Sequence, residues 1–229
     1  MTFFNDFITL IFPDLCRACN SPLLHGEAVI CTNCSYYLPQ TDSHLKAENP
    51  VSRLFWGRVE LDSAAAYYLF QKGGNVQHLL HQLKYKGRKE VGVELGLRFG
   101  AELKKAGLFS NVELIVPVPL HARKLKKRGY NQSELFGAGL AERMCIEQNT
   151  KCLVRETITE TQTRKSRFER WKNVESKFRL AEPKAVEGKH VLLVDDVVTT
   201  GATLEACAAC LLESAGTKVS IAVIAIAGL

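Results

Sequence analysis

Two adjacent carboxylates at the end of an apolar run are the first residues in this sequence that could do chemistry. Residues 191–203 read VLLVDDVVTTGAT, so an apolar strand leads into Asp195 and Asp196 and then into a turn rich in threonine. Paired carboxylates can accept hydrogen bonds from vicinal hydroxyl groups or hold a hydrated magnesium ion. We therefore expect Asp195 and Asp196 to position a sugar and to carry any catalytic role.

The turn after the two carboxylates is suited to a phosphate group. A helix that begins near Thr203 would direct its free N–H groups and the positive end of its dipole at the turn. Gly201 allows the backbone to close around a phosphate, and threonine hydroxyls add hydrogen-bond donors. Together with the carboxylates, the turn predicts a site for ribose 5-phosphate. Its expected residues are Val197, Val198, Thr199, Thr200, Gly201, Ala202 and Thr203.

Three other interpretations of this segment explain less. A P-loop would need G-x-x-x-x-G-K-[ST] and a Rossmann site would need G-x-G-x-x-G, and neither pattern occurs in the sequence. A purely structural turn, in which threonine caps a helix and the aspartates are solvated, accounts for Thr203. It does not account for two carboxylates crowded beside a glycine.

Two Cys-x-x-Cys pairs near the start of the chain indicate a metal site. Cys16 and Cys19 form the first pair, Cys31 and Cys34 form the second, and eleven residues separate the pairs. Four thiolates close a tetrahedral shell around zinc and leave no position for water, so we expect a structural zinc ion. The alternative, four unrelated buried thiols, fits such regular spacing less well.

Length and composition are compatible with one well-buried domain and a small appendage. The chain has 229 residues, 46% of them hydrophobic, and its net charge of +6 permits a polyanionic partner without requiring one. No apolar run approaches the roughly 20 residues that a membrane span needs. The apolar segment 3–11 lacks the charged start and the cleavage site of a signal peptide, so we expect a helix there and a cytoplasmic location.

Alternating strands and helices must hold the chemical groups in place. Apolar strands are expected at residues 64–70, 112–119, 151–155, 190–196 and 218–228, and helices at 73–87, 89–105, 133–146 and 203–216. This alternation predicts an α/β fold with a parallel sheet covered by helices, in which ligands bind at the carboxyl ends of the strands. Residues 35–60 are polar and irregular and are expected to form a connector.

The motifs, taken in order, resemble one protein family. VLLVDDVVTTGAT is similar along its full length to the signature with which type I phosphoribosyltransferases bind phosphoribosyl pyrophosphate (PRPP). The four-cysteine module, HQLKYKG, VPVPLH, RGYNQ, R-x-x-x-T-x-x-Q and a later R-x-x-N together resemble the ComF/GntX family. Its members are amidophosphoribosyltransferase-like proteins associated with DNA uptake in competent bacteria.

The resemblance implies a type I phosphoribosyltransferase-like domain at residues 61–229, preceded at 1–60 by a helix, the zinc module and a connector. It implies PRPP as a ligand, with Mg²⁺ beside it, and a role in DNA uptake. Segment 156–177 resembles the loop that closes over PRPP in this fold. Residues implied to bind pyrophosphate or another anion are Pro119, His121, Arg123, Lys124, Arg128, Arg164 and Arg170.

Two functions stay open at this point. In one, the protein is a PRPP-dependent transferase, although no acceptor pocket can be recognised from the sequence. In the other, it is a non-catalytic competence factor that binds single-stranded DNA or other DNA-uptake proteins. The segment HARKLKKR places five basic residues within positions 123–128, which suits either pyrophosphate or a nucleic-acid backbone. The acceptor, the protein partners and the oligomeric state are not indicated by any motif.

Overall fold

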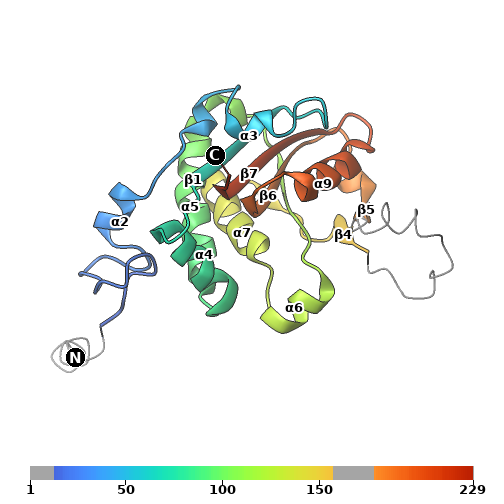
Figure 1. Ribbon diagram of the computed structural model, residues 1–229. Coiled ribbons are helices and arrows are strands. Elements are labelled where there is room, and N and C mark those ends of the chain that lie inside the picture. The colour runs from blue at the N-terminus through green and yellow to red at the C-terminus, as the bar shows by residue number, and fades with distance from the viewer. Residues whose placement is uncertain (1–12, 157–177, 229) are drawn as a thin grey trace.

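The centre of the protein is a five-stranded, all-parallel sheet with strand order β1-β7-β6-β2-β3 (Figure 1). The computed structural model describes residues 13–156 and 178–228, so the expected helix at 3–11 and residues 157–177 lie outside the described parts. The strands are β1 (Ser63–Leu69), β2 (Leu114–Pro117), β3 (Glu147–Gln148), β6 (His190–Val198) and β7 (Lys218–Ile226). Their carboxyl ends share one edge of the sheet, as expected for a ligand-binding α/β fold.

Helices cover both faces of this sheet, which explains why its central strands are apolar without alternation. Leu192 and Val194 of β6 face one buried cluster, whereas Val191 and Leu193 face the other. The first face carries α4 (Asn75–Tyr85), α5 (Lys89–Lys105) and α7 (Gln132–Met144), and the second carries α3 (Pro50–Arg53) and α9 (Ala202–Leu212). The predicted fold class is confirmed.

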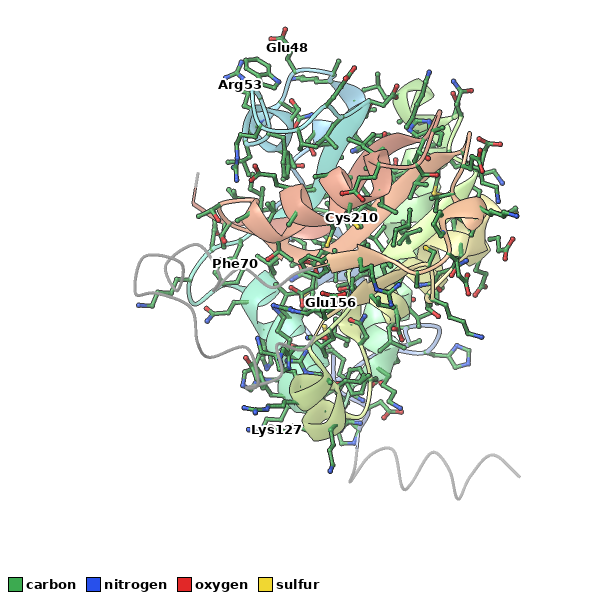
Figure 2. The ribbon with its side chains drawn as sticks, turned by 90° about the vertical axis from the view of Figure 1, so that its right-hand side faces the viewer. Glu48, Arg53, Phe70, Lys127, Glu156 and Cys210 are labelled. Carbon is green, nitrogen blue, oxygen red and sulfur yellow. The ribbon has the colours of Figure 1, made fainter. Side chains whose placement is uncertain are left out.

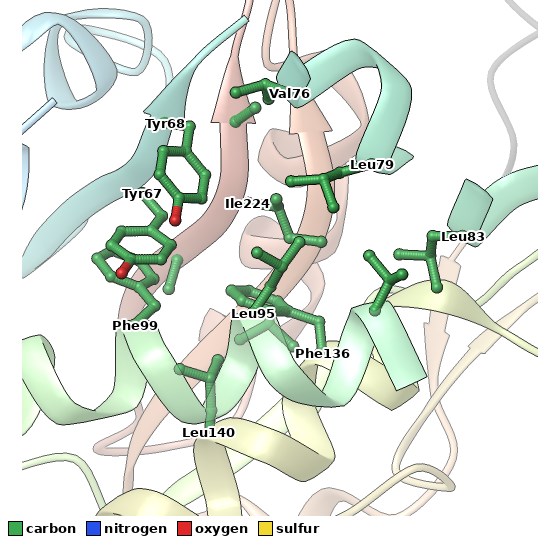
Figure 3. Packing of buried hydrophobic residues seen from close by; sticks show 14 of the residues in the cluster. Tyr67, Tyr68, Val76, Leu79, Leu83, Leu95, Phe99, Phe136, Leu140 and Ile224 are labelled. Atoms are coloured by element: carbon green, nitrogen blue, oxygen red, sulfur yellow. The ribbon is translucent and has the colours of Figure 1, made fainter. Parts of the chain in front are cut away.

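The first face shows how helix periodicity set the packing (Figure 3). The expected apolar stripe of α4 is buried against β7 and the neighbouring helices, with Leu79 and Leu83 beside Leu95 and Ile224. Such fully buried leucines contribute about 1.5–3 kcal/mol each relative to an exposed position. Tyr67 extends the cluster, because its ring stacks on Phe99 of α5 with centroids 4.8 Å apart.

Glycines allow α5 and α7 to approach more closely than ordinary side chains permit. A Cβ atom built on Gly96 would lie 2.2 Å from the carbonyl oxygen of Phe136, and one built on Gly139 would lie 2.1 Å from that of Val93. Backbone atoms cannot yield as a flexible side chain can. This seam fixes α7 against the sheet, and α7 in turn positions Ser133 at the carboxyl edge.

The expected connector is an ordered part of the second face. Asn49 donates to the carbonyl oxygens of Ser43, Lys46 and Ala64 at 2.8–3.1 Å, and its side-chain oxygen caps α3. Phe55 follows α3 and is fully buried. The apolar residues of this segment have no regular spacing, so periodicity could not reveal that it packs on β1. The expected division at residue 60 stays a prediction.

One predicted strand forms, but it pairs with a different strand than expected. Segment 151–155 was expected within the alternating parallel fold, but β4 (Leu153–Arg155) pairs antiparallel with β5 (Phe178–Leu180) in a separate two-stranded sheet. The edge of the central sheet is instead β3, whose two residues are too few to show a period. The remaining helices are α2 (Thr32–Tyr37) and α6 (Ala122–Arg128), with short 3₁₀ turns at Ser43–Leu45, Gly107–Phe109 and Pro183–Ala185.

Over residues 13–156 and 178–228, the helices are either too short or too polar to cross a bilayer.

Candidate functional site

The turn between β6 and α9 forms a small hollow at the carboxyl edge of the sheet. Asp195 and residues 197–204 line it. Gly201 has a φ of +79° and stands at the N-cap of α9, a backbone conformation that other residues rarely adopt. Within the described residues, no group accepts a hydrogen bond from the backbone N–H groups of residues 199–204. The hollow therefore presents a set of unpaired donors at a helix N-terminus, the arrangement that binds phosphate.

Asp195 lies at the inner side of this turn and is half-buried. Its Oδ1 atom accepts hydrogen bonds from Ser133 Oγ and from the backbone N–H of Asp196, both at 2.8 Å. Burial and the neighbouring Asp196 carboxylate raise the pKa of Asp195 to about 7, although these hydrogen bonds and Lys84 act in the opposite sense. Asp195 can therefore exchange a proton near neutral pH.

Asp196 is paired with a lysine that is distant in the sequence. Lys84 Nζ of α4 lies 2.8 Å from Asp196 Oδ1, and both side chains are largely shielded from solvent. The ammonium group occupies a position beside the carboxylates where a metal ion or a ribose hydroxyl could bind. Lys84 belongs to the motif HQLKYKG, so this contact explains one function of that motif.

The expected connector supports the turn from the outside. A Cβ atom on Gly201 would lie 2.9 Å from the ring of Phe55, so this ring packs directly under the turn. Arg58 donates from Nη1 to the carbonyl oxygen of Thr200 at 2.7 Å and pairs through Nη2 with Glu205 in the first turn of α9. The backbone carbonyl of Thr200 is thereby directed away from the hollow's N–H groups.

The residues of the motif RGYNQ make structural contacts that position other side chains of the site. Gly129 ends α6 with a φ of +81°, and the Tyr130 hydroxyl donates to the carbonyl oxygen of Leu83. Asn131 caps α7 by accepting from the Ser133 N–H at 3.2 Å, and it donates to the carbonyl oxygen of Val118 at 3.0 Å. These contacts aim the Ser133 hydroxyl at Asp195.

The residues expected to bind pyrophosphate are only partly brought to the site. Pro119 and His121 follow β2 at the same edge of the sheet as Asp195. The basic segment after them forms the helix α6, which His121 caps by accepting from the Arg123 N–H. Figure 2 shows Lys127 at the outer end of this helix, away from the sheet.

The residues expected to bind an anion differ in exposure and in their distance from the hollow. Arg123 and Lys124 are exposed, and neither lines the hollow at the turn. Arg128 is half-buried, and its guanidinium lies over the Tyr85 ring. Arg164 and Arg170 lie outside the described residues. Anion binding by all of these positions stays a prediction.

The four N-terminal cysteines converge as their spacing predicted. The sulfur atoms of Cys16, Cys19, Cys31 and Cys34 all lie within 4.8 Å of one another. Four sulfurs at 2.3 Å from a zinc ion would be about 3.8 Å apart, and Cys19 and Cys31 already have that separation, 3.8 Å. Backbone N–H groups also donate to the sulfurs, from Cys31 to Cys16 at 3.3 Å and from Cys34 to Cys31 at 3.4 Å. The cluster could hold a metal ion such as zinc.

Polar contacts attach the cysteine module to the helical face. His78 of α4 donates from Nδ1 to the carbonyl oxygen of Ala18 at 2.8 Å, and Arg98 of α5 donates to Ser35 Oγ at 2.7 Å. Figure 1 shows the module beside α4 and α5 rather than over the carboxyl edge of the sheet. The module therefore lies apart from the turn between β6 and α9.

Four residues near the turn were not among the expected site residues. They are Phe55, Arg58, Lys84 and Ser133. Lys84 and Ser133 lie in or directly after recognisable motifs, so those motifs carried a signal. Phe55 and Arg58 lie in the polar connector, where nothing in the local pattern distinguished them.

Comparisons with known proteins agree with this geometry. The family model described as "Phosphoribosyl transferase domain" matches residues 132–228, from α7 to the end of β7. The "DNA utilization protein YhgH" of Escherichia coli is 33% identical over 232 residues, which span 93% of this chain and 96% of that protein. The "Competence protein F" of Haemophilus influenzae is 39% identical over 93 residues, or 40% of this chain and 41% of its own. The "Competence protein ComFC" of Bacillus subtilis is 31% identical over 138 residues, or 60% and 54%.

Solved structures show more distant similarities. A glutamine PRPP amidotransferase from B. subtilis, complexed with ADP and GMP, aligns with 62% of this chain and 30% of its own, at 21% identity and a TM-score of 0.43. A hypoxanthine phosphoribosyltransferase from Staphylococcus aureus aligns with 60% of this chain and 62% of its own, at 16% identity and a TM-score of 0.34.

Proposed function

The chain belongs to the ComF/GntX family of phosphoribosyltransferase-domain proteins, and on that premise we propose that it binds PRPP with Mg²⁺ at the turn between β6 and α9. We further propose that this binding serves DNA uptake or utilization, the processes for which its relatives are named, and that it does so in the cytoplasm. The set of unpaired N–H groups at residues 199–204 is the observation that carries the proposal.

The turn suits the 5-phosphate of PRPP for electrostatic reasons. Hydrogen bonds from neutral donors to a charged phosphate contribute about 1.5–3 kcal/mol each, and several donors converge here. The dipole of α9 adds to them, since its positive end faces the hollow. The absence of a Cβ atom at Gly201 lets the turn pack on Phe55, which supports the N–H groups that line the hollow.

The two carboxylates suit the ribose and the magnesium ion. Asp195 and Asp196 offer hard oxygen ligands, which Mg²⁺ prefers, and acceptors for the two ribose hydroxyl groups. Lys84 holds a cationic group beside Asp196, so Mg²⁺ would take this position only when the ammonium group moves aside. When bound, Mg²⁺ would supply positive charge to the pyrophosphate of PRPP.

In a transferase reaction, the same residues would position C1 of the ribose. A bond would form between the acceptor and C1 while the bond from C1 to the pyrophosphate oxygen breaks, and its electron pair would leave with pyrophosphate. The carboxylates would lie where positive charge develops on the sugar, and basic groups would receive the leaving group. The observations support PRPP binding more directly than turnover.

We propose a separate, structural role for the cysteine cluster, with zinc as its ion. The donor set is four thiolates, and three of the four cysteines are buried. A closed shell of this kind leaves no position for a substrate, which argues against a catalytic metal.

Calorimetric titration with PRPP in the presence of Mg²⁺ tests the PRPP site. The wild-type protein should bind, and the double variant Asp195→Asn with Asp196→Asn should show no magnesium-dependent binding. Asp62→Asn is the matched control, because Asp62 precedes β1 at the opposite edge of the sheet. Unaltered affinity in a folded double variant would exclude this turn as the PRPP site.

A second candidate function, binding of single-stranded DNA, is favoured by α6. Its five basic side chains are exposed or half-buried. Among the described carboxylates, none forms an ion pair with these five residues. Free cations on one helix attract a phosphate backbone, and such binding weakens steeply with salt. Exchange of Lys126 and Lys127 for glutamate should weaken oligonucleotide binding and reduce its salt dependence by about two phosphate contacts. An unchanged salt slope would argue against this function.

A further inference from the structure

The connector, residues 35–60, is bound along one edge of the central sheet. β1 is the outermost strand on that side, and its inner neighbour is β7. On the outer side, the Leu69 N–H donates to the carbonyl oxygen of Pro39 at 2.8 Å, and the Thr41 N–H donates to that of Tyr67 at 3.1 Å. These bonds occupy backbone groups that an edge strand would otherwise expose. The connector is therefore held against β1 as a short extra strand would be.

Side chains of the connector continue this edge toward α3. Ser43 Oγ accepts from the Ala66 N–H at 2.9 Å and donates to the Ala66 carbonyl oxygen at 3.0 Å, so one hydroxyl group satisfies both backbone groups. Asn49, which caps α3, donates to the carbonyl oxygen of Ala64 at 2.9 Å. Ser43 and Asn49 are only 3% and 4% exposed, and hydrogen bonds shielded from water in this way are the stronger ones. The start of α3 consequently has a fixed position relative to β1.

Apolar contacts extend this fixed position from α3 to the turn after β6. Val51 and Phe55 are fully buried, and they belong to the same cluster as Val198 and Leu204, which lie on either side of the turn. A Cβ atom built on Gly201 would lie 2.9 Å from Cε1 and 3.2 Å from Cζ of the Phe55 ring. The ring therefore contacts the turn at the one position where the chain has no side chain.

The turn has few contacts of its own that could hold its shape. No side chain caps the N-terminus of α9, and among the described residues no group accepts from the N–H groups of residues 199–204. Gly201, with a φ of +79°, has more backbone conformations open to it than any other residue type would have. Segments with few internal contacts open most readily. Contacts from outside the turn must therefore supply the order that a phosphate site needs.

Two residues of the connector make such contacts. Phe55 packs under Gly201, and Arg58 donates from Nη1 to the carbonyl oxygen of Thr200 at 2.7 Å. The Phe55 ring is shielded from water, whereas the Arg58 side chain is partly exposed, so solvent competes only with the second contact. Phe55 is accordingly the stronger support. A loop that is already ordered in its bound shape binds more tightly, because the ligand does not have to order it.

From these contacts we infer that Phe55 is a positioning residue of the anion site: its ring, attached through α3 to the edge of the sheet, holds the turn in the shape in which the N–H groups converge on a phosphate. Its effect on PRPP affinity rests on the proposed function. Its effect on the order of the turn does not, because the ring contacts Gly201 whatever the ligand is. The connector thus becomes a working part of the site, and Phe55 and Gly201 form a matched pair.

Calorimetric titration of full-length variants with PRPP and Mg²⁺ tests the inference. The variants are Phe55→Leu, Gly201→Ala and the double variant that combines them. Leucine at position 55 stays apolar but lacks the two ring atoms that lie nearest to Gly201. Phe109→Leu is the matched control, because Phe109 is equally buried but belongs to the cluster on the other face of the sheet. Melting curves establish that each variant is folded.

Phe55→Leu should bind PRPP at least about threefold more weakly than wild type, because the ligand must now order the turn. Phe109→Leu should bind like wild type. In the double variant, the new methyl group has room where the ring atoms were, so the loss of affinity should be at least about twofold smaller than the product of the two single losses, the low end for side chains in contact. Losses that simply multiply, an equal loss in Phe109→Leu, or unchanged affinity in folded Phe55→Leu would overturn the inference.

Backbone ¹⁵N order parameters, measured without PRPP, separate this inference from the proposed function. For residues 199–203 they should fall from the rigid range, about 0.85, toward the flexible range, below about 0.6, in Phe55→Leu but not in Phe109→Leu. This fall, together with no PRPP binding by wild type, would refute the PRPP site and leave the positioning role standing. PRPP binding by wild type with unchanged order parameters in Phe55→Leu would do the reverse.

Discussion

The cysteine cluster and the turn after β6 use backbone N–H groups in opposite ways. In the cluster, the N–H groups of Cys31 and Cys34 already donate to sulfur atoms of the same module. In the turn, the N–H groups of residues 199–204 have no acceptor within the described parts of the chain. The first arrangement suits an ion that stays bound, because the chain supplies and orients every ligand. The second suits a ligand that arrives from solution, because its best donors are left for that ligand.

The two regions also differ in what supports them. The cysteine module is small, and polar contacts such as that of His78 with Ala18 hold it against α4 and α5. The turn lies between β6, whose residues up to Val194 are buried, and a helix, with Phe55 packed beneath it. We therefore expect the module to depend on its ion for order, and the turn to keep its shape without a ligand. The following four changes test this contrast, from the largest expected effect to the smallest.

Removal of one thiolate should have the largest effect. Cys34→Ser should abolish zinc binding, and residues 13–38 should lose protection from hydrogen exchange, because binding of structural zinc is worth about 10–16 kcal/mol in small modules. Peptides from β6 and β7 should keep their protection. Cys145→Ser is the control, since that thiol is exposed and remote from the cluster. A module equally protected with and without metal would show that the supposed contrast is wrong.

A methyl group at the turn should have the next largest effect. Gly201→Ala would place a Cβ atom 2.9 Å from Phe55, at a φ that already disfavours alanine. PRPP affinity should fall at least about tenfold, equivalent to about 1.4 kcal/mol, because the turn must shift away from Phe55 and its N–H groups lose their arrangement around the phosphate. Gly188→Ala carries similar backbone strain, with a φ of +70° and no atom within 4 Å of the new Cβ, and should bind PRPP normally. Equal losses in both variants would attribute the effect to strain alone.

The carboxylates should make the ligand-free turn less stable at higher pH. The pKa of Asp195 is raised to about 7 in the folded protein, above the ordinary value of 3.8, so between these values the folded state holds a proton that the unfolded state has lost. The stability that this group contributes is therefore present at low pH and is lost as the pH rises toward 7. Asp195→Asn cannot ionise and lacks this loss.

Melting curves of wild type and Asp195→Asn between pH 6 and 7 measure the difference. Relative to the variant, the wild type should lose about 2–4 °C over this range, corresponding to about 1 kcal/mol. Parallel curves would show that the carboxylate titrates normally and that the turn carries no electrostatic cost in the absence of a ligand.

Loss of the outer support should have the smallest effect. Arg58→Met removes the hydrogen bond to Thr200 and the ion pair with Glu205, both partly exposed to solvent. Exposed pairs contribute about 1 kcal/mol or less, so PRPP affinity should fall only a few-fold. Arg53→Met, which lies in α3 and contacts Trp56 instead, should have no effect on affinity. A complete loss of binding in Arg58→Met would mean that the turn depends on the connector far more than its buried strand implies.

Several features could be predicted because their signals are local. The run VLLVDD is apolar without alternation, which is typical of a strand covered on both faces, and the structure confirms it in β6. The stripe on α4 follows the helical period, and the cysteine pairs follow the spacing of metal ligands. In each case a physical requirement acts over a few neighbouring residues.

Other features depend on how the chain returns to a place, and no local pattern records them. Ser133 meets Asp195 across 62 positions in the sequence, Lys84 meets Asp196 across 112, and Arg58 meets Thr200 across 142. A lysine or arginine in a polar segment looks the same whether it is solvated or holds a carboxylate. A hollow lined by Phe70, Leu80, Val197 and Ala227 has the same origin, because three strand ends and the helix α4 must come together before it exists.

The sequence by itself therefore determined the parallel sheet, the position of the carboxylates and turn at its ligand edge, and the four converging thiols. Only the tertiary structure decided that Lys84 neutralises Asp196, that the connector packs under Gly201, and that Arg128 of α6 lies over the ring of Tyr85. The physical reason is the range of the interactions. Periodic burial and ligand spacing act between near neighbours, whereas charge pairing and cavity formation depend on segments that the fold alone brings together.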